Sequence, residues 1–233
     1  MLKNYYPATI IALALVILGL CLKSGIDNFT NKDRRVTVKG LAETEVNADH
    51  VTWPLKFNQM GNSLPDIYEK MGQTQNVITS FLTNNGIKSE EITISAPSVE
   101  DLDANQYRDN KMPYRYILTA TITVSSDSVD LVRKLIDRQG ELLKEGIAVY
   151  SNTYDTPVTY DYVSFQAMKP AMMAEAIKNA EATAKQFAEN SHSKLNKIVN
   201  ADQGQFSISD RDNNTPFIKR VRVVTTITYS LKN

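Results

Sequence analysis

The chain has 233 residues, with 26 basic and 26 acidic side chains and one cysteine, Cys21. Residues 1–26 hold two of the basic groups and none of the acidic ones, so the remainder is almost balanced in charge. That balance argues against a nucleic-acid partner, and the absence of cysteine from residues 27–233 excludes a disulfide there.

The N-terminal segment is apolar, and between residues 8 and 22 Thr9 is the only strongly polar residue. A helix of about eighteen residues spans roughly 27 Å, close to the thickness of a bilayer core. A cleaved signal peptide, a lipoprotein acylated at Cys21 and an uncleaved anchor are the three interpretations. Two candidate cleavage sites, 22–24 and 24–26, each carry an unsuitable residue, and only 19–21 is tolerable. Because the cleavage sites are poor and the large Leu20 precedes the cysteine, we favour an anchor over residues 1–26.

The polar residues 27–35 lack periodicity and predict a stalk linker. One or two long strands are expected next, over residues 34–60, with a bend near Gly40. A helix should then run from Ser63, as N-cap of a capping box, to a stop at Gly86. Its predicted buried stripe has 4-3-4-3 spacing: Ile67, Met71, Thr74, Ile78 and Phe81.

Two further helices are predicted, over residues 128–145 and 166–191. The first should end at Gly146, as the earlier helix ends at Gly86. Its expected inner face is Val129, Val132, Ile136 and Leu143; that of the second is Met173, Ile177, Ala180, Ala184 and Phe187.

Strand patterns occupy residues 90–99, 114–126, 146–151, 158–165, 196–209 and 218–231. The last alternates cleanly, with Val221, Val223, Thr225, Ile227 and Tyr229 on one face. We therefore predict one α+β domain over residues 36–233: a largely antiparallel sheet, about three covering helices and a possible duplicated strand–helix–strand unit.

Three segments together resemble the SIMPL domain family of bacteria: residues 36–57, the alanine-rich 171–206 and 221–231. The resemblance covers roughly residues 34–233 and implies an exported α+β protein, with relatives that include periplasmic immunogenic antigens and proteins linked to oxidative stress. It further implies ring- or channel-like oligomers and supplies no catalytic residues. The family's glycines after the alanine-rich helix correspond here to Ser191 and Asn196, so we expect a rebuilt turn.

Residue constellations for catalysis are missing from the sequence. His50 and His192 are far apart, no Gly-x-Ser-x-Gly motif occurs, and no glycine pair could cradle a phosphate. We therefore expect no catalytic, cofactor-binding or metal site and no enzyme activity. Two acidic loops, 101–109 and 210–214, begin like calcium loops but lack the required glycine and glutamate, so ordinary turns are the alternative.

Tyrosines crowd one stretch and are the candidate interface: Tyr150, Tyr154, Tyr160 and Tyr162. Tyrosine buries a ring while its hydroxyl still bonds, which suits a subunit contact or a sugar. The sequence thus favours a self-associating cell-envelope module, single-pass in the inner membrane with its domain in the periplasm, and the resemblance implies a link to envelope or oxidative stress. The alternative is a glycan- or peptide-binding protein whose small-molecule ligand is unknown.

Overall fold

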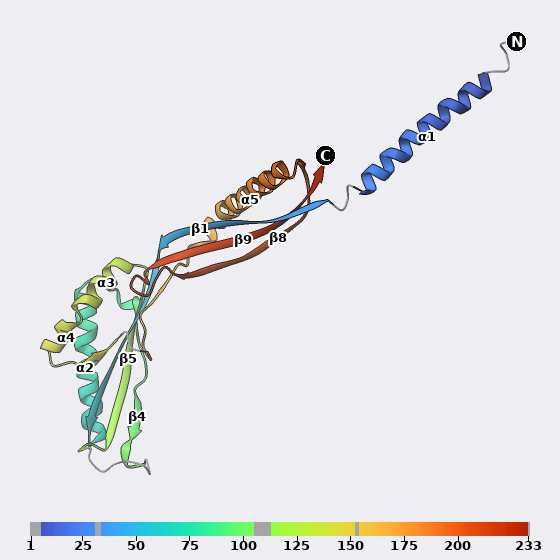
Figure 1. Ribbon diagram of the computed structural model, residues 1–233. Coiled ribbons are helices and arrows are strands. Elements are labelled where there is room, and N and C mark those ends of the chain that lie inside the picture. Colours follow the sequence, from blue (N-terminus) through green and yellow to red (C-terminus); the bar gives the residue numbers. More distant parts are fainter. Residues whose placement is uncertain (1–5, 31–33, 105–112, 152–153, 233) are drawn as a thin grey trace. The chain divides into compact units, whose positions relative to one another are not determined.

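The computed structural model describes residues 6–30, 34–104, 113–151 and 154–232 and divides the chain into two compact units (Figure 1). Unit 1 comprises residues 1–44, 167–208 and 221–233, and unit 2 comprises residues 45–166 and 209–220. The helices are α1 (Tyr6–Thr30), α2 (Leu64–Asn84), α3 (Val129–Arg138), α4 (Gly140–Lys144) and α5 (Phe165–Asn190). The strands are β1 (Arg35–Asn47), β2 (His50–Gly61), β3 (Ile92–Ile94), β4 (Ser98–Asp101), β5 (Tyr116–Ser126), β6 (Val149–Tyr150), β7 (Thr159–Asp161), β8 (Lys194–Asp210) and β9 (Ile218–Lys232).

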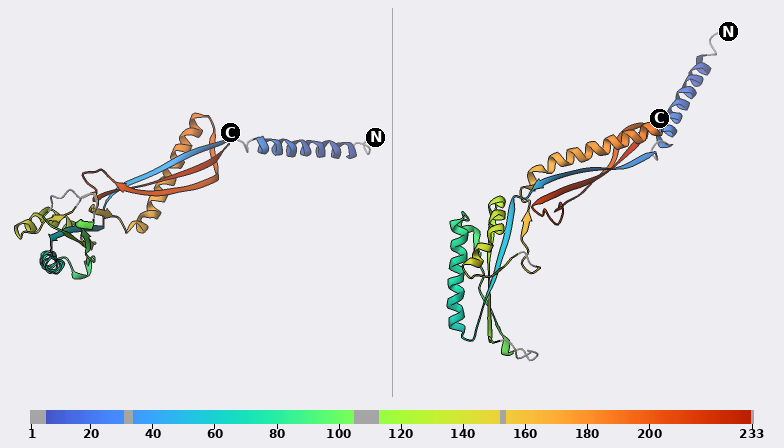
Figure 2. Two further views of the ribbon diagram at one scale, coloured as in Figure 1. Left: turned by 90° about the horizontal axis from the view of Figure 1, so that it is seen from below. Right: turned by 60° about the vertical axis from the view of Figure 1, so that its left-hand side comes forward.

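Unit 2 contains a six-stranded sheet with the order β3-β5-β2-β6, in which β4 also pairs with β5 and β7 with β2. The pairs are antiparallel, and Leu55 lies opposite Ile122. Alternate residues of β2 are at most 1% exposed, which gives the sheet one apolar face: Val51, Trp53, Leu55 and Phe57. Helices α2, α3 and α4 cover that face (Figures 1 and 2), so the predicted α+β class is confirmed.

Helix α2 has the predicted bounds, and its buried face is Ile67, Met71, Thr74, Ile78 and Leu82. Leu82 replaces the predicted Phe81, which is only partly buried. The side chain of Ser63 makes no capping bond, so the expected capping box is not formed. The stop is as predicted: Gly86 has a φ of +97°, and the Ile87 amide bonds to the carbonyl of Leu82.

The predicted helix over residues 128–145 is broken at Gln139 into α3 and α4. The inward face lies one residue earlier than predicted on both sides of the break: Leu135 and Leu142 are each 1% exposed, whereas the predicted Ile136 is only partly buried and the predicted Leu143 is 63% exposed. The second stop is again formed by Gly146, with a φ of +76°. Two strand–helix–strand segments, β2–α2–β3 and β5–α3–α4–β6, therefore lie in the same sheet.

Unit 1 contains a three-stranded sheet with the order β1-β9-β8. The Leu231 amide bonds to the Arg34 carbonyl and the hydroxyls of Thr37 and Thr228 meet at 2.9 Å, which shows that β1 and β9 are antiparallel. The predicted buried face of β9 is confirmed, with no residue more than 4% exposed: Val221, Val223, Thr225, Ile227 and Tyr229.

Helix α5 packs on this face through residues at every fourth position, four of which are alanines: Met172, Ala176, Ala180, Ala184 and Ala188. The predictions for Ile177 and Phe187 are wrong, because these side chains are 40% and 60% exposed. The reason lies at Gly40, where an added Cβ would stand 1.9 Å from the carbonyl oxygen of Ala176. Only small residues fit so close an approach, and larger ones are displaced to the flanks of the helix. Strand β1 passes through Gly40 unbroken, and the chain turns at Ala48–Asp49 instead.

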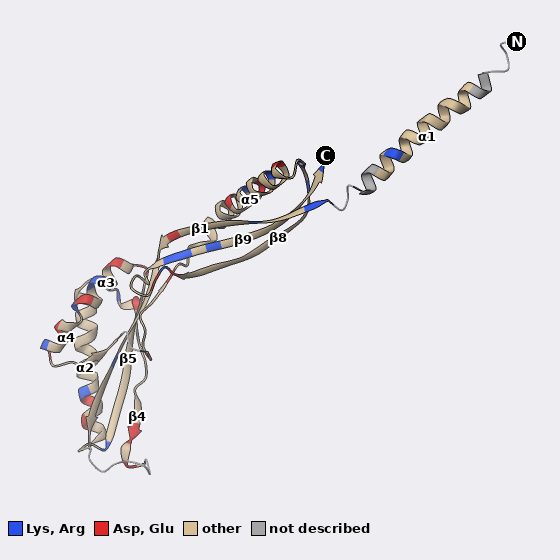
Figure 3. Ribbon diagram, viewed as in Figure 1, with Lys and Arg blue, Asp and Glu red and all other residues tan. Residues whose placement is uncertain are grey.

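Helix α1 contains a window, Thr9–Ile26, long and apolar enough to cross a membrane, and none of it is buried within the protein. Lys23 is the single charged residue of this window (Figure 3). Such a window suits a membrane span or a signal sequence. The helix extends to Thr30, into the predicted stalk.

Candidate functional site

The four candidate tyrosines lie in different environments, although all belong to unit 2. Tyr160 is 9% exposed and meets the Phe217 ring edge-on at 6.2 Å, and burial raises its pKa. Tyr162 is half-buried, whereas Tyr150 is 46% exposed and Tyr154 fully exposed. Tyr160 is thus a core residue of the folded unit, and Tyr150 and Tyr154 are the members that a partner could reach.

A groove lies beside Tyr150, with a volume of about 390 Å³. Strand pairing builds its floor: Lys56 of β2 lies opposite Tyr150 of β6, and Asn58 lies opposite Thr119 of β5. Because neighbouring residues of β2 face the helices, these side chains stand on the opposite face of the sheet. Asp155 completes the wall, and we call Lys56, Asn58, Thr119, Tyr150 and Asp155 the Tyr150 groove.

Three polar side chains of the Tyr150 groove have no partner among the described residues. Within the described part of the chain, the side chains of Lys56, Asn58 and Asp155 make no hydrogen bond or ion pair. The groove therefore presents a cation, an amide and a carboxylate beside a half-exposed aromatic ring. This combination can hydrogen-bond and stack on a ligand, but it contains no paired nucleophile and base.

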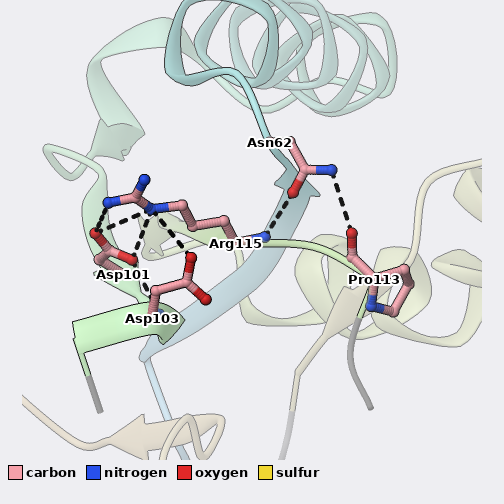
Figure 4. Close-up of polar contacts among 5 residues, drawn as sticks. All are labelled: Asn62, Asp101, Asp103, Pro113 and Arg115. Atoms are coloured by element: carbon pink, nitrogen blue, oxygen red, sulfur yellow. Dashed lines mark hydrogen bonds and ion pairs between the residues drawn. The ribbon is translucent and has the colours of Figure 1, made fainter. Parts of the chain in front are cut away.

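The first acidic loop is held by an arginine (Figure 4). The Arg115 guanidinium bonds to Asp101 at 2.8 Å and lies 3.5 Å from Asp103. Asn62 fixes the same corner by accepting the Arg115 amide and donating to the Pro113 carbonyl. Residues 105–109 of this predicted loop lie outside the described residues.

The second acidic loop is an ordinary turn. Asp212 accepts the amides of Asn214 and Thr215, and Arg211 pairs with it at 3.0 Å. Bonds from the Thr215 hydroxyl and from Arg211 lower the pKa of Asp212 to about 2. Asp210 pairs with Lys219. No group of three His, Cys, Asp or Glu residues that could hold a metal occurs within residues 6–30, 34–104, 113–151 and 154–232.

His50 lies at the start of β2, where its Nδ1 is 2.7 Å from Asp127 and its Nε2 is 2.9 Å from the Ser125 hydroxyl. Cross-strand pairing brings the three residues together, a contact that sequence reasoning missed. The side chain of Asp127 is 86% exposed, and the cavity beside it is lined by Asp127 but not by His50 or Ser125. The three side chains have the Asp–His–Ser order of a catalytic triad, and the absence of enzyme activity stays a prediction.

Comparison with protein families gives a match over residues 36–229 to the model described as SIMPL, protein of unknown function (DUF541). The chain belongs to the SIMPL family. No curated protein matches it. The SIMPL match spans segments of both compact units, so the family fold includes the two together.

The SIMPL domain has one long strand edge that sequence reasoning did not single out. Strand β8 has 17 residues and is bonded on one side to β9. Three of its large apolar side chains are exposed: Ile198 55%, Val199 46% and Ile208 40%. At the other edge of this sheet, the Asn179 side chain of α5 donates to the Leu41 carbonyl of β1. The two edges therefore differ, and β8 is the more open one.

Proposed function

We propose that this SIMPL protein is an exported module of the cell envelope, anchored by α1 in the inner membrane with its large domain in the periplasm, which assembles with copies of itself. The observation that carries the assembly is the edge of β8. Exposed backbone and apolar side chains on a 17-residue edge strand form a template for pairing with another strand.

The side chains of β8 offer little protection against such pairing. Lys194 and Lys197 stand at its start, but between Ile198 and Ile208 the only charged residue is Asp202. Edge strands that remain single usually carry charge or proline throughout. An identical strand is the simplest partner, and anchoring copies in one membrane raises their local concentration.

Tyr154, which is fully exposed, is placed to make a second contact. Strands β6 and β7, on either side of Tyr154 in the chain, have two and three residues and leave only short edges. Substitution of Tyr160 would damage the core of unit 2 and cannot test an interface.

The assembly is tested with the full chain in phospholipid nanodiscs and by cross-linking in native membranes. We expect a defined oligomer that Val199→Lys dissociates, because a lysine blocks edge pairing. Val77→Lys is the matched control, since Val77 is 38% exposed and belongs to α2 of unit 2 and not to β8. A monomeric wild-type chain in the membrane, or equal effects of the two substitutions, contradicts the proposal.

The anchor is tested separately by intact-mass analysis of protein extracted from membranes. Retention of α1 gives the mass of the uncleaved chain. A soluble mature protein that begins at Leu22 or later contradicts the anchor and leaves the β8 test unaffected.

A further inference from the structure

We propose that the Tyr150 groove binds an uncharged oligosaccharide. The groove uses side chains on the exposed face of the unit 2 sheet and none from β8. The inference is therefore independent of self-assembly through β8. It assigns a ligand to a site that the family match leaves without one.

The first argument is the contrast between this groove and the other polar clusters. Arg115 is held by Asp101, and Asp212 is held by Arg211 and the turn that follows. In the groove, by contrast, half-buried Lys56 and Asn58 have no protein partner among the described residues. A half-buried polar group is stabilised when it forms a hydrogen bond. The donors and acceptors of the groove can therefore form such bonds with a ligand.

The second argument is the tyrosine ring. Tyr150 lies directly across from Lys56 in the β2–β6 pair and still exposes 46% of its surface. An aromatic ring held on a sheet presents a rigid apolar face, with its hydroxyl free to bond. The C–H face of a sugar ring stacks on such a surface, while the sugar hydroxyls both donate and accept.

The third argument is the charge of the lining. The charges of Lys56 and Asp155 cancel one another. Asp155 would repel a strongly anionic ligand, and Lys56 would repel a strongly cationic one. A ligand without net charge avoids both conflicts and uses both groups as hydrogen-bond partners. The volume of about 390 Å³ lies in the range typical of small-ligand sites.

A peptide fits this location less well. Peptides commonly bind a sheet by adding a strand to a bare edge. Strand β5 is bonded on both sides at Thr119, and the edges that β2 and β6 leave open beside the groove are only a few residues long, too short for an added strand. Recognition must use side chains, as sugar binding does.

The test uses the full chain in phospholipid nanodiscs prepared without glycoside detergents, whose sugar headgroups would compete. Saturation-transfer NMR is recorded with triacetylchitotriose, cellotriose and maltotriose, with trigalacturonate as the charged comparator and a neutral Ser/Thr-rich octapeptide as the peptide arm. We expect transfer to at least one neutral trisaccharide and weaker transfer to trigalacturonate and to the peptide.

Tyr150→Ala should weaken binding at least about fivefold, as should Asn58→Leu as a second variant. Tyr68→Ala is the matched control, because Tyr68 is an exposed tyrosine of unit 2 that lines a different hollow. Near-ultraviolet circular dichroism verifies the fold of each variant. No transfer to any neutral trisaccharide at millimolar concentration overturns the proposal. So does a loss of binding in Tyr68→Ala but not in Tyr150→Ala, or a preference for the peptide.

Discussion

The sheet and the helix of unit 1 approach one another closely at Gly40. A methyl group there would stand 1.9 Å from the Ala176 carbonyl oxygen and 2.8 Å from the Ala180 side chain. The alanines of α5 and the glycine of β1 therefore form one seam that tolerates no added atom.

Gly40→Ala should lower the free energy of unfolding by about 3 kcal/mol or more, because either the helix or the strand must shift. Gly72→Ala is the control, since an added Cβ in α2 meets nothing within 4 Å. Alanine is the better helix former, so this change should stabilise by about 0.5–1 kcal/mol. Denaturant unfolding followed by far-ultraviolet circular dichroism measures both. Similar effects of the same sign would refute the seam.

His192 ends α5 in an unusual conformation for a residue with a side chain, with a φ of +53°. The sequence predicts a rebuilt turn at the positions of the family's glycines, Ser191 and Asn196. The residue in the left-handed conformation is instead His192. The amide of Ser193 then bonds to the Ala188 carbonyl at 2.8 Å and closes the helix.

His192→Gly should raise the free energy of unfolding by about 0.5–1 kcal/mol, because glycine adopts this conformation without steric cost. His192→Val should lower it, since β-branched residues are the least tolerant of positive φ. Thermal unfolding of the two variants tests the assignment. A less stable glycine variant would contradict it.

Helices and strands show how far a sequence pattern reaches. The stripe of α2 and the alternation of β9 are correctly predicted because each stays in register from end to end. Prediction fails where two adjacent apolar residues compete for the inward position, as Leu142 and Leu143 of α4 do, and where close backbone approach displaces large residues, as for Phe187 of α5. Neither cause is visible in spacing alone.

The Tyr150 groove shows the same limit for a site. Its tyrosine stands out in the sequence, but Lys56 and Asn58 come from a strand about ninety residues away, and only the β2–β6 and β2–β5 registers bring them together.

Two adjacent leucines of α4, Leu142 and Leu143, test which of them faces the core. Leu142→Ala should cost about 2–5 kcal/mol, because Leu142 is 1% exposed. Leu143→Ala should change the stability by less than about 0.5 kcal/mol, because Leu143 is 63% exposed. The unbroken helix expected from the sequence predicts the reverse order, so the ranking of the two midpoints in urea decides between them.

The whole molecule divides into two compact units, and the single domain predicted from the sequence extends over both of them. Strands β1, β8 and β9 and helix α5 each contribute residues to both units without an interruption in their pattern. No linker, glycine run or change of composition marks the boundary. A division of this kind follows from pairing between distant segments, which composition does not record.

Stability in acid should depend on carboxylates of unit 2. Burial raises the pKa of Asp49, but bonds from Ser164 and from the amides of Val163 and Ser164 outweigh it and lower the pKa. Bonds from the Thr215 hydroxyl and from Arg211 lower the pKa of Asp212 to about 2. A carboxylate whose pKa is lower in the folded than in the unfolded protein stabilises the fold when the pH is above its unfolded pKa, which is about 4. This contribution is lost as the pH falls through its folded pKa.

We therefore expect stability to fall from about pH 4 toward pH 2. Asp49→Asn and Asp212→Asn should each be less stable at pH 7 and lose less on acidification. Thermal midpoints at pH 7, 5, 4 and 3 provide the measurement. A parallel decline in wild type and both variants would show that other groups are responsible.

The pairing of β1 with β9 has a consequence for the order in which the protein can fold. Thr37 and Thr228, which meet across this pair, are 191 residues apart in the sequence. As the chain is synthesised from its N-terminus, most of unit 2 emerges and can collapse while β1 still lacks its partner. Unit 1 can close only after β9 has been made. Until then β1 lacks the strand that pairs with it, and we expect unit 1 to complete its fold after unit 2.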